Sequence, residues 1–579
     1  MNLIRPVLPD LDYAQWREKP RMARIRTMTG HWAEHGFGTP DGVYLIYVVK
    51  IVAYVAGALL FVQLTPGIGS LHQLSSWWAE PVVFQKVVIF TLLFEVLGLG
   101  CGFGPLTLRF FPPIGGPLHW MRPGTIRLPP WPNRVPCTGG DTRTVVDVAL
   151  YVGVLGCAMY ALLSPATRSG TDLPTAIGTL SPQVLLPLLI VLPMLGLRDK
   201  VIFLAARAEV YWAMAVVFLL PGLDMIVAAK MLFLFVWWAA ATSKLNRHFP
   251  HVVAVMMTNS PLLRGKALKR RFYRSHPDDL RPSAVSAALA HLGTAVEFLV
   301  PLALFASNGG AVTIVAAAVM VAFHLHILSC VPMAVPLEWN VYMLFGIGYL
   351  FVWNAQYGLT ALTHPFLVGL IAVGVLTPVV LGNRYPGVFS FLPAMRYYAG
   401  NWATSMWCLK PTAVEKIERN VPKAATLPGT QLIKLYGEQV ADLLSHKGYA
   451  FRAMHTHGRA LFGLIPRACG PDHETDYVPV DGEFVAGTVL GWNFGDGHLH
   501  NEQLIEALQR RCDFDPGEVR VIVLESQPFG RPRQDYRLVD AATGEFERGQ
   551  VAVADMLANQ PWVEGIPAFV LSVTHQHRP

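Results

Sequence analysis

The sequence predicts an α-helical polytopic membrane protein, with about ten transmembrane helices, that carries a soluble α+β domain at its C-terminus. Three observations support this fold class. The 579 residues are 53% hydrophobic and only 15% charged, with a mean hydropathy of +0.39, which is too apolar for an ordinary soluble protein. Apolar stretches of spanning length recur along the chain up to Gly382. After Trp407 the composition becomes that of a soluble domain.

The apolar stretches are long enough to cross a bilayer as helices. A hydrocarbon core about 30 Å thick requires roughly 20 apolar residues in a helix. The fourth stretch is short, and only Arg198, Asp199 and Lys200 separate it from the fifth. These two stretches therefore predict either a tight hairpin or one broken span. The candidate spans lie near residues 43–64, 83–103, 145–163, 183–197, 200–220, 222–243, 284–306, 311–333, 338–355 and 360–382.

Lys and Arg collect in alternate loops between these stretches. They occur in the N-terminal arm, in the loop from Arg109 to Arg143, at Arg198 and from Arg264 to Arg274, whereas the loops "SNGG" and "NAQYG" contain neither. Loops rich in Lys and Arg stay in the cytoplasm. A ten-span protein of the inner (plasma) membrane with both termini in the cytoplasm satisfies this rule. The net charge of +7 is spread over these loops, so nucleic-acid binding is not expected.

The composition divides the chain into four parts. Residues 1–42 form a basic arm, 43–382 the transmembrane domain, 383–428 a juxtamembrane linker and 429–579 the soluble domain. In the soluble part, "TQLIKLYGEQVADLLSHKG" and "NEQLIEALQRRC" predict helices, and "EVRVIVLES" and "PAFVLSVT" predict strands. Seven scattered cysteines without a CxxC motif indicate neither a disulfide framework nor a thiolate zinc site.

One stretch inside the membrane region cannot hold a regular helix. "PLTLRFFPPIGGPLHWMRPGTIRLPPWPNRVP" is rich in Pro and Gly and also contains Phe, Trp, Leu and Arg. It predicts either an interfacial or re-entrant segment that caps a cavity, or a long ordered surface loop.

Ionisable residues inside the apolar stretches are candidates for function, because a buried charge is costly in a bilayer unless it is paired or faces water. Glu297 lies deep in its stretch, and Pro301 has no amide hydrogen to offer the carbonyl of Glu297. A carboxylate beside a free carbonyl suits a cation, a protonated base or a substrate hydroxyl. The alternative is a salt bridge between helices, with Lys230 or Arg207 as the partner.

His324 and Lys244 are the other two candidates. On a helix, His324 and His326 point about 200° apart, so they cannot both bind one metal ion. Either imidazole can exchange a proton near neutral pH. Lys244 stands where an apolar stretch meets a polar loop, and burial makes a lysine a usable base.

Three of these stretches, taken together, are similar to a known membrane domain. "SKLNRHFP", "AHLGTAVEFLVPLALF" and "FHLHILSCVPMAVPLEWNVYMLFG" resemble, in order and spacing, the domain of vitamin K-dependent γ-carboxylases and, more loosely, of lipase maturation factors. The resemblance covers Thr242 to Gly346. It implies that Lys244 is the base in the oxidation of a reduced quinone, that Phe323 and His324 line the same site, and that Glu297 is its acidic residue.

The chain departs from the carboxylase pattern at three points. Asn246 stands where an acidic residue is usual, the C-terminal domain is unlike that of the carboxylase, and the predicted topology places Lys244 on the cytoplasmic side, opposite to the carboxylase base. Over its full length the chain also resembles an uncharacterised bacterial family of transmembrane proteins of unknown function. That second resemblance implies no activity.

Histidine pairs occur in the soluble domain, in "HTHGR", "GDGHLHNE" and "THQHRP". On a strand, residues two apart share a face, so His455 with His457, or His498 with His500, could supply two imidazoles to a tetrahedral zinc ion. No sequence rule brings the pairs together. Zinc is therefore not the expected cofactor, and these four residues are only candidate metal ligands.

The leading hypothesis is a membrane-embedded enzyme, similar to γ-carboxylase, that acts on or with a lipophilic quinone or lipid in an intramembrane cavity. Lys244 would be the base, Glu297 would stabilise its charged state, and His324 would orient the substrate or transfer a proton. The quinone or a bound lipid would be the cofactor. The residues expected to contact the substrate are Asn246, Phe323, His326, His291 and Glu95.

Two other functions are compatible with the sequence. One is a non-catalytic scaffold or maturation partner, anchored in the lipid bilayer, that contacts another protein through its C-terminal domain. The other is a transporter, suggested by Glu95, Arg207 and Glu209 within apolar stretches, although no internal repeat is visible.

Overall fold

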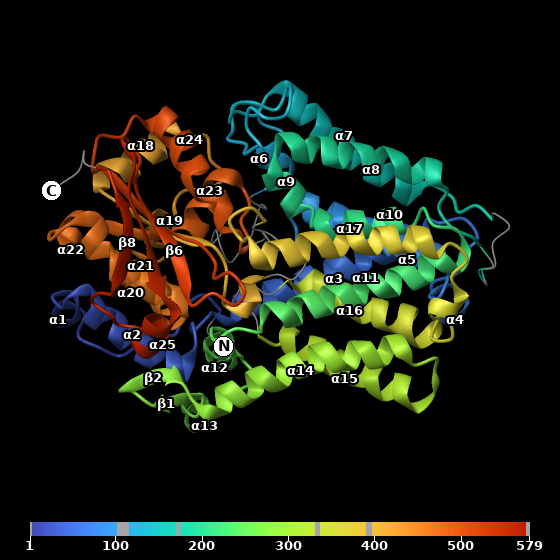
Figure 1. Cartoon of the computed structure of the whole chain (residues 1–579), viewed down its shortest axis with the longest axis horizontal. Helices are drawn as coiled ribbons and strands as arrows, with labels where there is room; N and C mark the ends of the chain where they lie inside the picture. Colours follow the sequence, from blue (N-terminus) through green and yellow to red (C-terminus); the bar gives the residue numbers. More distant parts are fainter. Residues whose placement is uncertain are drawn as a thin grey trace.

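The computed structural model describes residues 3–100, 115–168, 173, 175, 177–330, 336–389 and 396–574. A bundle of apolar helices fills one side of the molecule, and an α/β domain lies against one end of the bundle (Figure 1). The N-terminal helices lie beside the C-terminal domain at the same end. Residues far apart in sequence therefore meet where the bundle and the domain join.

Six helices in the described part of the chain are long and apolar enough to cross a membrane. They are α3 (Asp41–Gln63), α7 (Val145–Leu163), α11 (Gly222–Ser243), α14 (Ala284–Ala306), α15 (Gly310–Leu328) and α17 (Pro365–Arg384). The mostly helical membrane class and the C-terminal sheet are thus confirmed, whereas the count of about ten spans is not.

The remaining predicted spans correspond to shorter segments in the same bundle. These are α5 (Pro81–Val96), α8 (Pro182–Arg198), α9 (Lys200–Ala205) with α10 (Ala208–Val217), and α16 (Leu337–Gly346) with the π-helix η1 (Ile347–Trp353). Helices α8 and α9 form the tight hairpin, because Asp199 ends α8 and its side chain caps α9. Arg207 has a left-handed backbone (φ 49°), which separates α9 from α10.

Successive segments run in opposite directions, so the loops alternate between the two ends of the bundle (Figure 1). Helix α4 (Leu74–Trp77) and the 3-10 turn η2 (Leu359–Ala361) lie at the end away from the domain. The domain end holds α1 (Tyr13–Arg17), α2 (Arg21–His35), α6 (Pro117–Trp120), α12 (Phe249–Asn259), α13 (Lys266–Arg270), β1 (Tyr273–Ser275) and β2 (Asp279–Pro282). That this end faces the cytoplasm remains a prediction from the distribution of Lys and Arg.

The C-terminal domain is built on an antiparallel sheet with the strand order β4-β3-β5-β6-β7-β8. Its strands are β3 (Thr404–Leu409), β4 (Val478–Asp481), β5 (Val519–Leu524), β6 (Arg533–Asp540), β7 (Gly544–Ala552) and β8 (Ala568–Val573). Strand β3 comes from the predicted linker, yet it is an inner strand, with Met406 opposite both Asp481 and Ile522. All six β3 residues are buried, so this strand has no alternating polar pattern in the sequence.

Helices cover both faces of this sheet. They are α18 (Pro411–Asn420), α19 (Pro428–Tyr436), α20 (Glu438–Met454), α21 (Thr456–Cys469), α22 (His473–Asp476), α23 (Gly482–Leu490), α24 (Glu502–Cys512) and α25 (Val553–Ala558), with the 3-10 turns η3 (Arg396–Ala399) and η4 (Gly497–Leu499). Met406 and Ile522 pack against α21. Trp407 and Val521 point to the opposite face, where the apolar core continues through α23 and α24 into the helical bundle.

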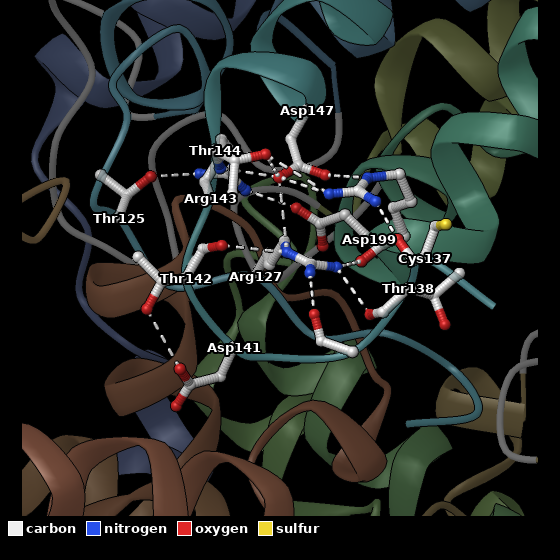
Figure 2. Close-up of polar contacts among 12 residues, drawn as sticks. Thr125, Arg127, Cys137, Thr138, Asp141, Thr142, Arg143, Thr144, Asp147 and Asp199 are labelled. Atoms are coloured by element: carbon white, nitrogen blue, oxygen red, sulfur yellow. Dashed lines mark hydrogen bonds and ion pairs between the residues drawn. The ribbon is translucent and has the colours of Figure 1, made fainter. Parts of the chain in front are cut away.

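Buried arginines hold the loop between α5 and α7 in place (Figure 2). Asp147, at the start of α7, accepts a hydrogen bond from Arg198 Nε at 2.5 Å, and its other carboxylate oxygen lies 3.4 Å from Arg127 Nε. Arg143 Nη2 contacts Asp199 Oδ2 at 2.5 Å, with neither side chain exposed. Each arginine in the cluster therefore has a carboxylate partner.

The same loop contacts the C-terminal domain. Asp141 Oδ2 accepts hydrogen bonds from Arg510 Nη2 at 2.7 Å and from Arg511 Nη1 at 2.9 Å. Trp120 Nε1 donates a hydrogen bond to the Leu490 carbonyl at 2.9 Å. From residue 115 onward, the Pro- and Gly-rich stretch is thus an ordered loop between the bundle and the domain. Its first part, 105–114, lies outside the described residues.

We expect Asp147→Asn to destabilise the whole protein, because the change removes the carboxylate that contacts the buried Arg127 and the partly buried Arg198. The free energy of unfolding should fall by about 3 kcal/mol, measured as a lower melting temperature by tryptophan fluorescence in detergent. Asp278→Asn is the matched control, since the Arg26–Asp278 pair is exposed and should contribute little. Equal shifts for both variants would contradict the role given to the arginine cluster.

Candidate functional site

The lysine and the acid that were predicted to act together are in contact. Lys244 ends α11, and its Nζ contacts Glu297 Oε2 on the adjacent helix α14. Their side chains are only 9% and 5% exposed. The rings of Phe249 and Phe323 lie 5.2 and 5.8 Å from the ammonium nitrogen. The result is a buried ion pair bordered by aromatic rings.

The two alternative partners that the sequence suggested for Glu297 have other contacts. Lys230 Nζ donates to the backbone carbonyls of Asn354 and Tyr357, both at 2.7 Å. Arg207 Nε lies 3.6 Å from Glu209 Oε1. An ion pair between helices is therefore present at Glu297, but its partner is Lys244.

His324 is held between three helices of the bundle. Its Nε2 accepts a hydrogen bond from Trp237 Nε1 at 3.1 Å, and its Nδ1 lies 2.8 Å from Asn340 Oδ1. Because an indole can only donate and an amide oxygen can only accept, the proton must be on Nδ1. Both ring nitrogens are thus engaged in joining α15 to α11 and α16. The ring of the neighbouring Phe323 lies 5.8 Å from Lys244 Nζ.

Asn246 supports the backbone next to this ion pair. Its Oδ1 accepts hydrogen bonds from the backbone amides of His248 at 2.7 Å and Phe249 at 3.0 Å. These amides open α12 and have no partner inside the helix. An aspartate could accept the same two bonds, so the asparagine that departs from the carboxylase pattern is suited to capping α12.

The other predicted substrate contacts are not gathered around Lys244. His291 and His326 are exposed on the outer faces of α14 and α15. Glu95 is buried in α5, beside Glu338 of α16, whose Oε2 lies 2.9 Å from Lys50 Nζ of α3. Glu95, Glu338 and Lys50 therefore form a buried charged cluster on helices other than those that hold Lys244 and Glu297.

The predicted histidine pairs lie on helices and turns rather than on strands. His455 joins α20 to α21 and His457 lies in α21, whereas His498 and His500 lie in and just after η4. His498 Nε2 contacts Glu525 Oε2 at 2.7 Å, and His500 Nδ1 contacts Ser405 Oγ at 2.7 Å. In the described part of the chain, no three His, Cys, Asp or Glu side chains are placed to bind one metal ion. The third pair, in "THQHRP", lies outside the described residues.

A cavity of about 870 Å³ lies elsewhere, where the start of α3 meets the N-terminal arm and the C-terminal domain. Most of the side chains that line it are apolar. The N-terminal arm and α3 contribute Leu3, Ile4, Val43, Ile46 and Tyr47, and the domain contributes Leu432, Leu444, Phe451, Val480 and Phe484. Neither Lys244, Glu297 nor His324 lines this cavity.

Local features of the sequence build the cavity walls. Gly437 has a positive φ of 79°, which lets the chain turn sharply between α19 and α20. The turn packs Leu432 of α19 against Leu444 of α20. The N-terminal arm closes another side, because the buried Lys447 ammonium donates to the carbonyls of Val7 at 2.7 Å and Phe37 at 2.6 Å.

Three charged residues that line the cavity form its polar end. Arg452 of α20 contacts Asp481 directly and lies 3.2 Å from Glu483 Oε1. Its Nη1 lies 2.8 Å from His457 Nε2. Trp402 Nε1 donates to Glu483 Oε1 at 2.7 Å. One guanidinium group is therefore held between two carboxyl groups in the wall of a mainly apolar cavity.

Burial controls the protonation of these groups. It raises the pKa of Glu483 to about 7, even though the nearby Arg452 lowers it. Burial and the charge of Arg452 hold the pKa of His457 well below its usual range. His457 is thus neutral, and Glu483 is the group of this cluster that exchanges a proton near neutral pH.

Sequence reasoning missed this polar end, although a signal was present. Asp481 and Glu483 open an otherwise apolar helix in "VPVDGEFVAGTVLGW", and two acids beside an apolar run are typical of a helix start. Arg452 stands three residues before His455 and belongs to no recognisable motif. No local pattern indicates that residues 3–46 form the opposite wall.

A family model described as a transmembrane protein of unknown function (DUF3556) matches residues 1–571. The predicted full-length resemblance to such a family is confirmed. No curated protein and no solved structure matches the chain. The partial likeness to γ-carboxylases stays a prediction.

We expect Lys244→Met and Glu297→Gln each to destabilise the bundle, because each change leaves one partner of a buried ion pair alone. Each single variant should lose about 3 kcal/mol of unfolding free energy. The double variant should lose clearly less than the sum of the two, since it leaves no unpaired charge. Thermal melting of all four proteins in the same detergent measures this coupling, and additive losses would contradict the ion pair.

The raised pKa of Glu483 makes stability depend on pH. A carboxyl group whose folded pKa exceeds its unfolded value stabilises the fold below about pH 4.5, and this contribution disappears as the pH rises through about 7. At most, roughly 3 kcal/mol is involved. We expect Glu483→Gln to remove this part of the pH dependence of the melting temperature.

The exposed Glu564 provides the matched control, because Glu564→Gln should leave the pH dependence unchanged. A Glu483→Gln protein whose melting temperature falls with pH as steeply as that of the wild type would show that Glu483 does not take up the proton.

Proposed function

The chain belongs to this family of transmembrane proteins of unknown function, and we propose that it holds a membrane lipid or similar lipophilic molecule in the cavity between α3 and the C-terminal domain. The observation that supports this proposal is the cavity itself. Its volume of about 870 Å³ is within the range of about 300–1,000 Å³ that is typical of small-molecule sites. Its lining is mainly apolar, with charged groups at one end.

The position of the cavity suits a ligand that comes from the bilayer. The wall residues Val43 and Ile46 belong to the first turns of α3, a candidate membrane span. On the same helix, Leu45, Val48 and Val49 are exposed and would face lipid. A ligand chain could therefore pass from the bilayer along α3 into the cavity. Each methylene group buried there contributes about 0.8 kcal/mol.

The membrane-embedded enzyme suggested by the carboxylase resemblance is the second candidate. The specific observation in its favour is the contact between Lys244 and Glu297, with Phe323 beside them. A quinone retained by the purified protein and lost in Lys244→Met would support it. A retained lipid that depends on the cavity, and not on Lys244, would support the first proposal instead.

We expect a leucine at position 448 to displace the ligand. Gly448 lines the cavity on α20, and a side chain added there meets no atom within 4 Å, so Gly448→Leu should fill space without straining the backbone. Native mass spectrometry and lipid extraction would compare the detergent-purified proteins. The variant should retain at most a fifth of the lipid that the wild type carries, roughly 1 kcal/mol of lost affinity.

Gly374→Leu is the control for this experiment. Gly374 lies exposed on helix α17, and a side chain added there also meets no atom within 4 Å. This variant should retain as much lipid as the wild type. Equal retention by all three proteins would place the bound lipid outside the cavity and refute the proposal.

A further inference from the structure

The polar end of the cavity has an excess of negative charge. Asp481 and Glu483 provide two carboxyl groups, and Arg452 provides the balancing guanidinium group. The neighbouring His457 is neutral, because burial and Arg452 hold its pKa well below its usual range. When Glu483 is ionised, one negative charge is left without a cationic partner in this cluster. Lys434 also lines the cavity, but it lies on the exposed face of α19.

The guanidinium group of Arg452 is already engaged by the protein. Its Nε and Nη2 contact Asp481, its Nη2 also lies 3.2 Å from Glu483, and its Nη1 lies 2.8 Å from His457. An anionic ligand would have to displace one of these carboxylates. The arginine therefore positions the two acids and is not the group that a ligand would contact first.

One carboxylate oxygen of Glu483 is available to accept a hydrogen bond from a ligand. The side chain is 2% exposed and lines the cavity. Its contacts with described residues are made through Oε1, which accepts Trp402 Nε1 at 2.7 Å and lies beside Arg452. The described residues make no hydrogen bond to Oε2, and Glu483 lines the cavity. A carboxylate oxygen accepts hydrogen bonds and binds cationic donors most strongly, so a ligand that donates a hydrogen bond and carries positive charge would be stabilised there.

We propose that Glu483 binds the head group of the ligand and that this head group is a protonated amine on an amphiphile. The amine enters first and reaches Glu483, and the alkyl chain lies along the apolar wall towards α3. This inference rests on the proposed function, because it identifies the chemical class of the molecule held in the same cavity.

Three probes with the same chain and different head groups test the inference. Dodecylamine, dodecanol and dodecanoic acid would each be added to the full-length protein in detergent, and native mass spectrometry would measure their occupancy. We expect dodecylamine to bind at least about tenfold more tightly than dodecanoic acid, which corresponds to about 1.4 kcal/mol. Dodecanol should bind with intermediate affinity, since it can donate a hydrogen bond but carries no charge.

The variant Glu483→Gln should reduce the preference for the amine to less than about threefold, roughly 0.7 kcal/mol, while Glu564→Gln should leave it unchanged. Melting temperatures would confirm that both variants are folded. The order of the three probes on the wild-type protein tests the inference independently of any variant. Tighter binding of dodecanoic acid, or equal binding of dodecanol and dodecylamine, would overturn it.

The Gly448→Leu protein separates failure of this inference from failure of the proposed function. If that variant binds all three probes as well as the wild type does, the cavity is not a binding site and both proposals fail. If it loses all three probes, but the wild type binds them equally, the cavity binds lipophilic molecules and only the preference for an amine is refuted.

Discussion

Charges buried between the helical bundle and the C-terminal domain must be paired, and the arrangement of the two parts depends on this constraint. Arg127, Arg143 and Arg198 are held by Asp147 and Asp199 at the ends of α7 and α8. The same loop then reaches the domain through Asp141 and its contacts with Arg510 and Arg511. Because an isolated buried charge costs several kcal/mol, the loop can be stable only in a conformation that satisfies these pairs. That conformation places the sheet against the bundle.

The cavity is a consequence of this docking. One wall is the start of a membrane helix, another is the N-terminal arm, and the remaining walls come from α19, α20, β4 and α23. None of these elements encloses the space by itself. The polar end follows the same rule as the loop, since Arg452 lies between Asp481 and Glu483. It differs in one respect that matters for binding, because its two acids exceed its single cation.

The residues predicted to be catalytic show what can be predicted from composition and spacing alone. A lysine at the end of an apolar stretch and a glutamate deep inside another are costly unless they are paired, and Lys244 and Glu297 do contact each other. His324 satisfies the same requirement differently, through Trp237 and Asn340. The histidine spacing in the soluble domain was less informative, because the expected strands are helices and turns. His455 and His457 still stack, with ring centroids 5.5 Å apart, whereas His498 and His500 contact different partners.

The sequence by itself determined that the chain is a mostly helical membrane protein with a C-terminal domain, where its apolar helices lie, and which charges needed partners. Hydrophobicity and length govern these properties, and both are local. The tertiary structure alone decided which partner each charge has, that β3 joins the sheet from the predicted linker, and that residues 3–46 enclose a cavity with Glu483. Burial and hydrogen bonding depend on segments hundreds of residues apart, so no local pattern contains that information.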